Sequence, residues 1–166
     1  MFLLLPFSAS PQPLSPYDVK AAFIYNFLKF VEWPPESFTT DETPYVVGVL
    51  GRDPFGGALE RTMRGKLVNN RRIVVVRLDY RDMRNCHLLF VSASERPRYR
   101  EIFAELGNAP VLTVGDTEDF ADEGGAIGFF VEENKVRFEI NPNAARRANL
   151  RLSSNLLGIA RIVPGR

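Results

Sequence analysis

One stretch near the N-terminus decides the fold. It reads Val19-Lys20-Ala21-Ala22-Phe23-Ile24-Tyr25-Asn26-Phe27-Leu28-Lys29-Phe30-Val31-Glu32-Trp33-Pro34. At about 100° per residue, its apolar side chains cover about two-thirds of a helix circumference. The polar side chains fall on one narrow strip, formed by Asp18, Tyr25, Asn26, Lys29 and Glu32. Lys20 lies within the apolar arc, but its amine can extend past the helix end. The pattern predicts a helix that the rest of the fold largely encloses.

Both ends of this helix are marked by residues that typically start or end helices. Ser15-Pro16-Tyr17-Asp18 is typical of a helix start, with Ser15 as the N-cap and Pro16 at the first helical position. Trp33-Pro34-Pro35 ends the helix, because the residue before a proline avoids the α region. Trp33 has two interpretations. Either it anchors a protein partner together with Tyr25 and Lys29 of the polar strip, or it fills the base of the core.

Size and composition indicate a single globular domain. The chain has 166 residues, of which 45% are hydrophobic and 25% are charged, so a core can form without disulfides. The net charge of +1 gives no overall attraction to nucleic acid or to acidic lipid. No apolar run reaches the length of about eighteen residues that a membrane span needs. We therefore expect no nucleic-acid partner and no direct membrane insertion.

Residues 1–14 differ from the rest. An apolar run is followed by small residues and a proline-rich segment, as in the second half of a secretory signal, but the positive n-region is missing. We expect a signal-peptide remnant or a flexible arm here, and one domain over residues 15–166. This segment favours an exported protein.

The middle of the chain alternates between buried strands and helices. Four apolar runs bounded by turn residues predict strands at residues 45–50, 73–78, 88–91 and 111–114. Helical spacing predicts helices at residues 58–63 and 96–106. This alternation is typical of an α/β fold with a sheet covered on both faces.

The C-terminal part predicts a hairpin and two further helices. Residues 126–131 and 135–140 flank a turn, and in the second arm Val136, Phe138 and Ile140 alternate with Arg137 and Glu139. The alternation predicts one buried and one solvated face. Helices follow at Asn141-Pro142 and after Ser153. The expected fold is therefore a single compact α/β domain, with a mixed sheet flanked by helices and a C-terminal antiparallel hairpin followed by helices.

Catalytic and metal-binding patterns are not found. His87 is the single histidine and Cys86 the single cysteine, so neither an internal disulfide nor a His-rich site can form. Because neighbours on a strand point to opposite faces, Cys86 and His87 cannot jointly hold a metal ion. The acidic run at residues 116–123 lacks the ligand spacing of a calcium loop. We expect no catalytic residue, no metal and no cofactor.

The loop Gly51-Arg52-Asp53-Pro54-Phe55-Gly56-Gly57 follows a predicted strand and precedes a predicted helix. Phosphate loops occupy this place in α/β proteins, but both phosphate-loop spacings are absent. The glycines either allow a tight turn or leave room for a small anion or ligand. Two clusters of opposite charge, at residues 61–84 and 116–123, fit self-association or a charged protein partner.

Five stretches resemble the YfiR-like family, in the family's order. They are residues 19–34, residues 49–56, residues 86–91, residues 111–116 with 124–127, and residues 136–141 continuing through 144–145 to 152–157. The resemblance implies a compact α/β domain that tends to dimerise and acts as a non-enzymatic periplasmic regulator. The best-known members bind the periplasmic sensory region of an inner-membrane diguanylate cyclase and hold it inactive, which lowers cyclic-di-GMP and biofilm formation. Others resemble regulators of sensor kinases.

One departure from the family limits what the resemblance implies. The best-known members carry disulfides that couple them to redox state, whereas only Cys86 is present here, so redox sensing is not carried over. Two functions therefore compete. One is a periplasmic repressor of a membrane signalling enzyme, which the resemblance implies, and the other is a periplasmic small-molecule-binding protein with its site at residues 51–57.

Overall fold

A computed structural model describes residues 14–165, so nearly all of the expected signal remnant or arm lies outside the described residues. The helices are α1 (Pro16–Phe30), α2 (Ala58–Met63), α3 (Tyr99–Leu106), α4 (Pro142–Arg147) and α5 (Ser154–Ile159). Three 3₁₀ turns are η1 (Pro35–Ser37), η2 (Tyr80–Asp82) and η3 (Ala93–Arg98). The strands are β1 (Val31–Glu32), β2 (Tyr45–Leu50), β3 (Leu67–Val68), β4 (Arg71–Leu78), β5 (Leu88–Val91), β6 (Leu112–Gly115), β7 (Ile127–Glu132), β8 (Lys135–Ile140), β9 (Arg151–Leu152) and β10 (Arg161–Ile162).

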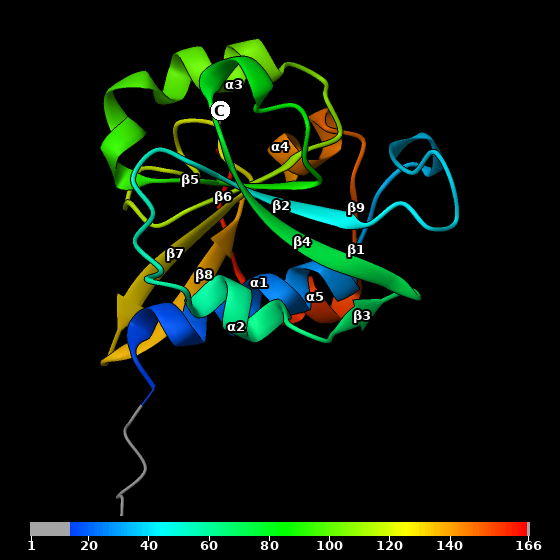
Figure 1. The fold of residues 1–166 in the computed structure, drawn as a ribbon. Helices are drawn as coiled ribbons and strands as arrows, with labels where there is room; N and C mark the ends of the chain where they lie inside the picture. The colour runs from blue at the N-terminus through cyan, green and yellow to red at the C-terminus, as the bar shows by residue number, and fades with distance from the viewer. Residues whose placement is uncertain (1–13, 166) are drawn as a thin grey trace, which may run out of the picture.

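The main sheet is mixed, as predicted. Its strand order is β10-β8-β7-β6-β5-β2-β4-β3, while β1 and β9 form a separate antiparallel pair. Strands β4, β2, β5, β6 and β7 are parallel, and β8 returns antiparallel to β7 as the predicted hairpin. The chain reverses direction across the sheet after β4, because β5 lies on the other side of β2. Figure 1 shows α3 on one face of this sheet and α1, α2 and α5 on the other.

Helix α1 forms as its sequence predicts and lies against the sheet. Ser15 caps it, and the side chain of Asp18 completes a capping box. Ile24, Phe27 and Leu28 have no exposed surface, which confirms the predicted burial of the apolar arc. The expectation for Lys20 was wrong. Its side chain is buried with an exposed fraction of 8%, and its amine forms an ion pair with Asp116 instead of extending to solvent.

Two further predictions need correction. The helix predicted at residues 96–106 begins as η3, and α3 starts only at Tyr99, because Pro97 disfavours the α conformation at the residue before it. Glu139 was predicted to face solvent but is buried, since Arg161 of β10 covers it with an ion pair of 2.6 Å. The short strands β1, β3, β9 and β10 were not predicted, because two residues carry no periodic signal.

Candidate functional site

Trp33 lies in the core. Its exposed fraction is 8%, and its indole Nε1 donates a hydrogen bond of 3.0 Å to the carbonyl oxygen of His87. Its ring meets the ring of Tyr45 edge-on at 5.6 Å. A tryptophan held in this way packs the base of the sheet, the second of its two interpretations, and presents little surface to a partner.

His87 has a structural environment. Its Nδ1 accepts a hydrogen bond from the backbone N–H of Val46 at 3.0 Å, so its Nε2–H donates to the carbonyl oxygen of Ser37 at 2.9 Å. The ring of Phe38 stacks on it at 4.6 Å. Burial lowers the pKa of His87 and the positive charge of Arg71 adds to this, although the bond to Ser37 opposes it. With both ring nitrogens engaged, His87 is poorly placed for acid–base chemistry.

Folding stability is expected to decline between pH 7.5 and pH 5.5. Below a pH of about 6.5, the unfolded chain protonates His87 while the folded protein resists protonation, so stability is lost as pH falls. The slope cannot exceed about 1.4 kcal/mol per pH unit for one proton. Urea unfolding of the wild type and of His87→Gln measures this. The free energy of unfolding should be lower for the variant than for the wild type and should change less with pH. If it changes equally with pH for both proteins, the prediction is wrong.

Cys86 is buried beside this histidine. Its thiol lies 3.3 Å from the carbonyl oxygen of Met83, and burial raises its pKa to about 12. A thiol with so little thiolate character is a poor nucleophile and a poor redox sensor. Within residues 14–165, no three or more His, Cys, Asp and Glu side chains gather as metal ligands.

Tyr25 and Lys29 lie together on α1, apart from the buried Trp33. The hydroxyl of Tyr25 donates to the carbonyl oxygen of Leu67 at 3.4 Å, and its ring lies 5.1 Å from the amine of Lys29 and 4.8 Å from that of Lys66. Lys29 is exposed, whereas Tyr25 is half-buried. The three residues predicted as one partner-binding set therefore do not form one surface.

The loop at residues 51–57 borders a cleft at the carboxyl ends of β2 and β4. The cleft has a volume of about 540 Å³ and is lined from the loop by Gly51 and Asp53, from β4 by Arg77, and from η3 by Glu95 and Arg98. In open α/β sheets, ligands bind in such crevices where the strand order reverses. The backbone N–H of Arg52 donates to the Ser94 hydroxyl, so the loop is tied to η3.

The loop itself is turn-forming, and its charges are paired. Gly51, Gly56 and Gly57 have positive φ angles of 89°, 57° and 91°, which explains their residue type. Asp53 accepts a hydrogen bond from the N–H of Phe55 at 2.8 Å and forms an ion pair with Arg77. Helix α2 has six residues, which is too short to act as an anion site by its N-terminus alone.

The acidic cluster is paired mostly within the protein and the basic cluster in part, but the printed ion pairs do not join one cluster to the other. From the acidic run, Asp119 pairs with Arg96 and Glu123 with Arg100, both on the α3 side. From the basic run, Arg61 pairs with Asp18 and Arg77 with Glu60. Ion pairs of this kind leave less net charge for steering a partner than the sequence suggests.

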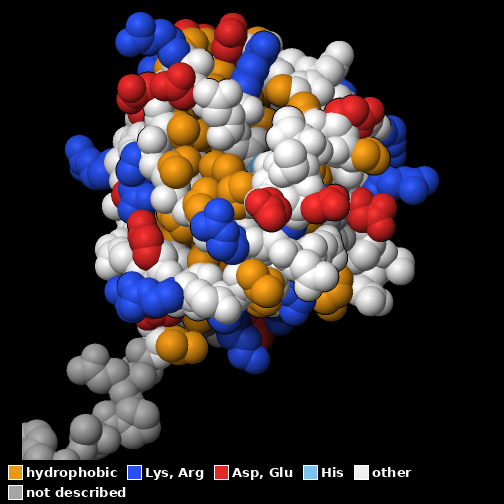
Figure 2. All heavy atoms as spheres, turned by 45° about the vertical axis from the view of Figure 1, so that its right-hand side comes forward, with side chains coloured by type: hydrophobic (Ala, Val, Ile, Leu, Met, Phe, Trp, Pro, Cys, Tyr) orange, Lys and Arg blue, Asp and Glu red, His pale blue; other side chains and the backbone are white. Residues whose placement is uncertain are grey.

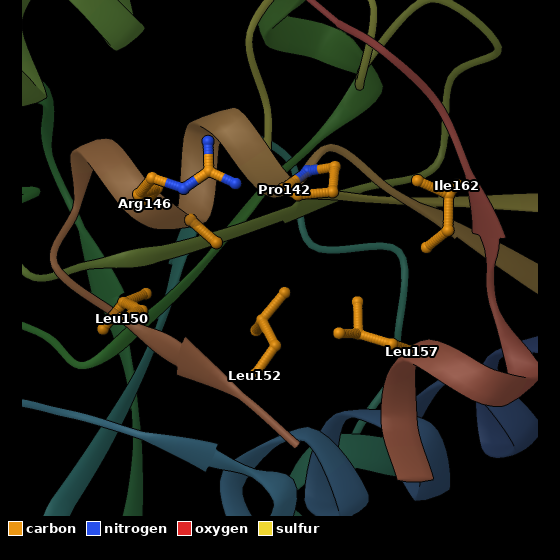
Figure 3. A pocket seen from close by; sticks show the side chains of 7 residues that line it. Pro142, Arg146, Leu150, Leu152, Leu157 and Ile162 are labelled. Carbon is orange, nitrogen blue, oxygen red and sulfur yellow. The ribbon is translucent and has the colours of Figure 1, made fainter. Parts of the chain in front are cut away.

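An apolar pocket near the C-terminus was missed by the sequence analysis. It has a volume of about 330 Å³ and lies between α4, β9, α5 and β10, lined by Pro142, Ala145, Arg146, Leu150, Leu152, Leu157 and Ile162. Figure 3 shows Leu152 and Leu157 pointing toward Pro142 and Ile162 across the recess. Arg146 is the one charged side chain that lines it. Such a pocket can accept an apolar side chain or an apolar ligand.

Exposed apolar residues lie at this pocket and near it. Ile162 on β10, which lines the pocket, is 50% exposed. Ile159 on α5 is 69% exposed and lines a second recess of about 260 Å³, together with Phe23 and Phe27 of α1. Across Leu152, a neighbouring recess of about 300 Å³ is lined by Lys29 and Glu32. We call the pocket together with Ile159 and Ile162 the C-terminal apolar surface. The sequence carries a signal for it, since more apolar residues follow Leu156 than a last short helix can bury.

The fold is a single α/β domain, and the C-terminal apolar surface is its candidate binding site. Among residues 14–165, no helix is long and apolar enough to cross a membrane. The sequence matches the YfiR/HmsC-like family over residues 17–161, so the chain belongs to this family. The family is periplasmic and regulatory, and at the level of the family the match supports a regulator of a diguanylate cyclase.

The other comparisons inform only the fold. No curated protein sequence matches this chain. A solved structure described as the ABC domain in complex with L-Trp from Streptococcus pneumonia resembles it with a TM-score of 0.56 at 7% identity. The alignment covers 89% of this chain and 60% of that one, so this chain spans about 60% of the length of its structural relative.

Proposed function

We propose that this protein binds the periplasmic sensory region of an inner-membrane diguanylate cyclase and holds the enzyme inactive, which lowers cyclic-di-GMP and biofilm formation. The periplasmic domain of a sensor kinase is the second class of partner. Membership of the YfiR/HmsC-like family supports this proposal. The observation that carries it is the C-terminal apolar surface, where Ile162 is exposed at an open apolar pocket and Ile159 is exposed at the neighbouring recess against α1.

The surface suits a protein partner in its chemistry. Interfaces draw most of their affinity from a few anchors that enter well-packed apolar pockets, surrounded by a polar rim. The pocket can receive such an anchor, and Arg146, together with Lys29 in the neighbouring recess, provides a polar rim. We therefore propose Lys29 and Tyr25 as rim contacts, while Trp33 supports the fold from the core. We propose no catalytic step and no cofactor.

Binding to the periplasmic regions of the inner-membrane diguanylate cyclases of the same organism tests the proposal. Ile162→Glu places a carboxylate at the pocket and should weaken binding at least about tenfold, with the fold intact by circular dichroism. Val131→Glu is the matched control, because Val131 is 64% exposed on the β7–β8 hairpin and should tolerate the same change. If both variants bind the cyclase region with equal affinity, the C-terminal apolar surface is not the interface. If the wild type does not bind it at all, a diguanylate cyclase is not the partner.

A second function is favoured by the cleft at residues 51–57. A volume of about 540 Å³ at the carboxyl ends of β2 and β4 suits a small molecule, which would make the protein a periplasmic small-molecule-binding protein. A thermal-shift screen of periplasmic metabolites against the wild type and Gly51→Val measures this. The added side chain meets Ser94 and Glu95, so a ligand of this cleft should stabilise only the wild type.

A further inference from the structure

Positive charge is concentrated in the last part of the chain. Residues 142–166 contain five arginines and no acidic residue, so their charge of +5 offsets a charge of −4 on residues 1–141 and leaves the net charge of +1. Such an asymmetry bears on which molecules a protein attracts and not on its fold. Residues 142–162 form α4, β9, α5 and β10, the four elements around the apolar pocket. The C-terminal apolar surface is therefore built from the basic part of the chain.

Two arginines at this surface have no acidic partner within residues 14–165. Arg146, which lines the pocket, donates a hydrogen bond of 2.8 Å to the uncharged side chain of Asn143. Arg151 lines the recess on the other side of Leu152. It lies opposite Glu32 in the β1–β9 pair, but the two side chains form no ion pair. Both arginines are exposed, so their charges face the solvent.

Lys29 adds a third cation in the recess that Arg151 lines. It is exposed, and its amine lies 5.1 Å from the centre of the Tyr25 ring rather than against a carboxylate. Arg161 of β10 differs, because Glu139 neutralises it at 2.6 Å. The pocket and the recess together are lined by three cations and by one carboxylate, that of Glu32. A positive potential therefore surrounds the open apolar pocket.

Charges of opposite sign are interspersed elsewhere on the protein. Figure 2, which brings the right-hand side of Figure 1 forward, shows basic and acidic side chains mixed over one face. In the acidic run at residues 116–123, Asp116, Asp119 and Glu123 each pair with a basic side chain of the same chain. A second copy would therefore offer few carboxylates to these arginines. The complementary negative charge is that of a different molecule.

The shape of the surface favours a protein over a membrane. Proteins that lie on a membrane usually bury the apolar face of a long amphipathic helix in it, whereas α5 has six residues. Here Leu150, Leu152 and Leu157 line a recess of about 330 Å³, and Figure 3 shows the last two pointing across it. A recess accepts a side chain that protrudes from a partner, which is how protein interfaces place their anchors.

We propose that the C-terminal apolar surface binds an acidic segment of the partner protein that carries a large apolar side chain. The apolar side chain enters the pocket. Carboxylates beside it pair with Arg146 at the pocket and with Arg151 and Lys29 in the recess beyond Leu152. Arginine can bind a carboxylate with two parallel hydrogen bonds, so these pairs orient the segment as well as attract it. The inference rests on the proposed regulatory function and adds the chemistry of the segment that the regulator recognises.

The rate of association with a periplasmic cyclase region tests the charge. For the full chain, the association rate constant should fall at least about tenfold between low and high salt, because complementary charges steer the encounter. Arg151→Glu should slow association at low salt at least about tenfold. Arg81→Glu is the matched control and should associate like the wild type. It makes the same change of net charge at an exposed residue of η2, which follows β4 at the other end of the strand order from β10.

A pair of fluorescent probes tests the surface without the partner. Anilinonaphthalene sulfonate is an apolar anion, and phenylnaphthylamine has the same rings without the sulfonate. The wild type should bind the anion at least about tenfold more tightly than the neutral probe, because a hydrogen-bonded charge pair contributes that much. Arg146→Gln should remove the preference, and Arg81→Gln should keep it. Ile162→Glu should weaken the binding of both probes, since it places a carboxylate at the pocket.

The outcomes separate this inference from the proposed function. If a cyclase region binds but Arg151→Glu and Arg81→Glu associate at the same rate, or if both probes bind equally well, the inference is wrong and the regulatory function stands. If no cyclase region binds while the wild type prefers the anionic probe, the regulatory function fails and the acidic, apolar ligand of this surface is supported. If the wild type binds phosphatidylglycerol vesicles and Ile162→Glu does not, the surface binds lipid and the inference is wrong.

Discussion

Replacing Phe27 by Asp is expected to unfold the protein. Phe27 has no exposed surface, and its ring lies 5.0 Å from that of Phe138 and 5.8 Å from that of Phe129. Loss of a buried phenylalanine costs about 3–5 kcal/mol, and the carboxylate adds a desolvation penalty. A domain of this size has about 5–15 kcal/mol of stability, so this one change removes most or all of it.

The same helix offers a matched control. Ala22 lies on the exposed side of α1, so Ala22→Asp introduces the same carboxylate without burying it. Surface substitutions of this kind change stability by about 0.5 kcal/mol. Thermal unfolding followed by circular dichroism measures both variants. If Phe27→Asp melts at the temperature of Ala22→Asp, α1 does not form the centre of the core.

Buried strands were the part of the fold that the sequence predicted best. Residues 45–50 and 88–91 form β2 and β5 with the predicted bounds, because each is a continuous apolar run between turn residues. The N-caps at Ser15, Asn141 and Ser153 also form as predicted, since a cap depends on residues within one helical turn. Local chemistry decides these features, so local sequence predicts them.

Contacts between distant parts of the chain account for what was missed. Lys20 is buried because Asp116 pairs with it, and Glu139 is buried because Arg161 covers it. No periodicity in α1 or β8 can reveal a partner from another element. The C-terminal apolar surface is built from four segments that include β9 and β10, strands too short to predict. Trp33 likewise lies in the core because its indole finds the carbonyl of His87.

Removal of the Asp116 carboxylate is the second change with a large expected effect. Asp116 follows β6 and joins α1 to the carboxyl edge of the sheet. Its Oδ2 lies 3.0 Å from the amine of Lys20 and accepts a hydrogen bond of 2.7 Å from the Tyr17 hydroxyl. The two ion-pair side chains are 10% and 7% exposed. The same amine lies 4.2 Å from the centre of the Tyr17 ring, so one carboxylate holds two side chains of α1 in place.

Asp116→Ala leaves the buried amine of Lys20 without its counterion and the hydroxyl of the half-buried Tyr17 without its acceptor. Breaking a buried ion pair by removing one partner costs about 3–5 kcal/mol. Urea unfolding at pH 7 should show this loss as a lower midpoint with an unchanged slope. Glu118→Ala is the control, because Glu118 is exposed in the same loop and its removal changes the net charge equally.

A double substitution separates the cost of the unpaired charge from the loss of packing. Buried ion pairs replaced on both sides by apolar residues of similar volume often keep their stability. Lys20→Met combined with Asp116→Leu should therefore recover most of the stability that Asp116→Ala loses. An Asp116→Ala variant as stable as Glu118→Ala would show that the pair contributes nothing, and a double variant no better than Asp116→Ala would assign the loss to packing. The recovery that we expect would assign the lost stability to the unpaired charge of Lys20, which is the charged residue of α1 that is buried in the core.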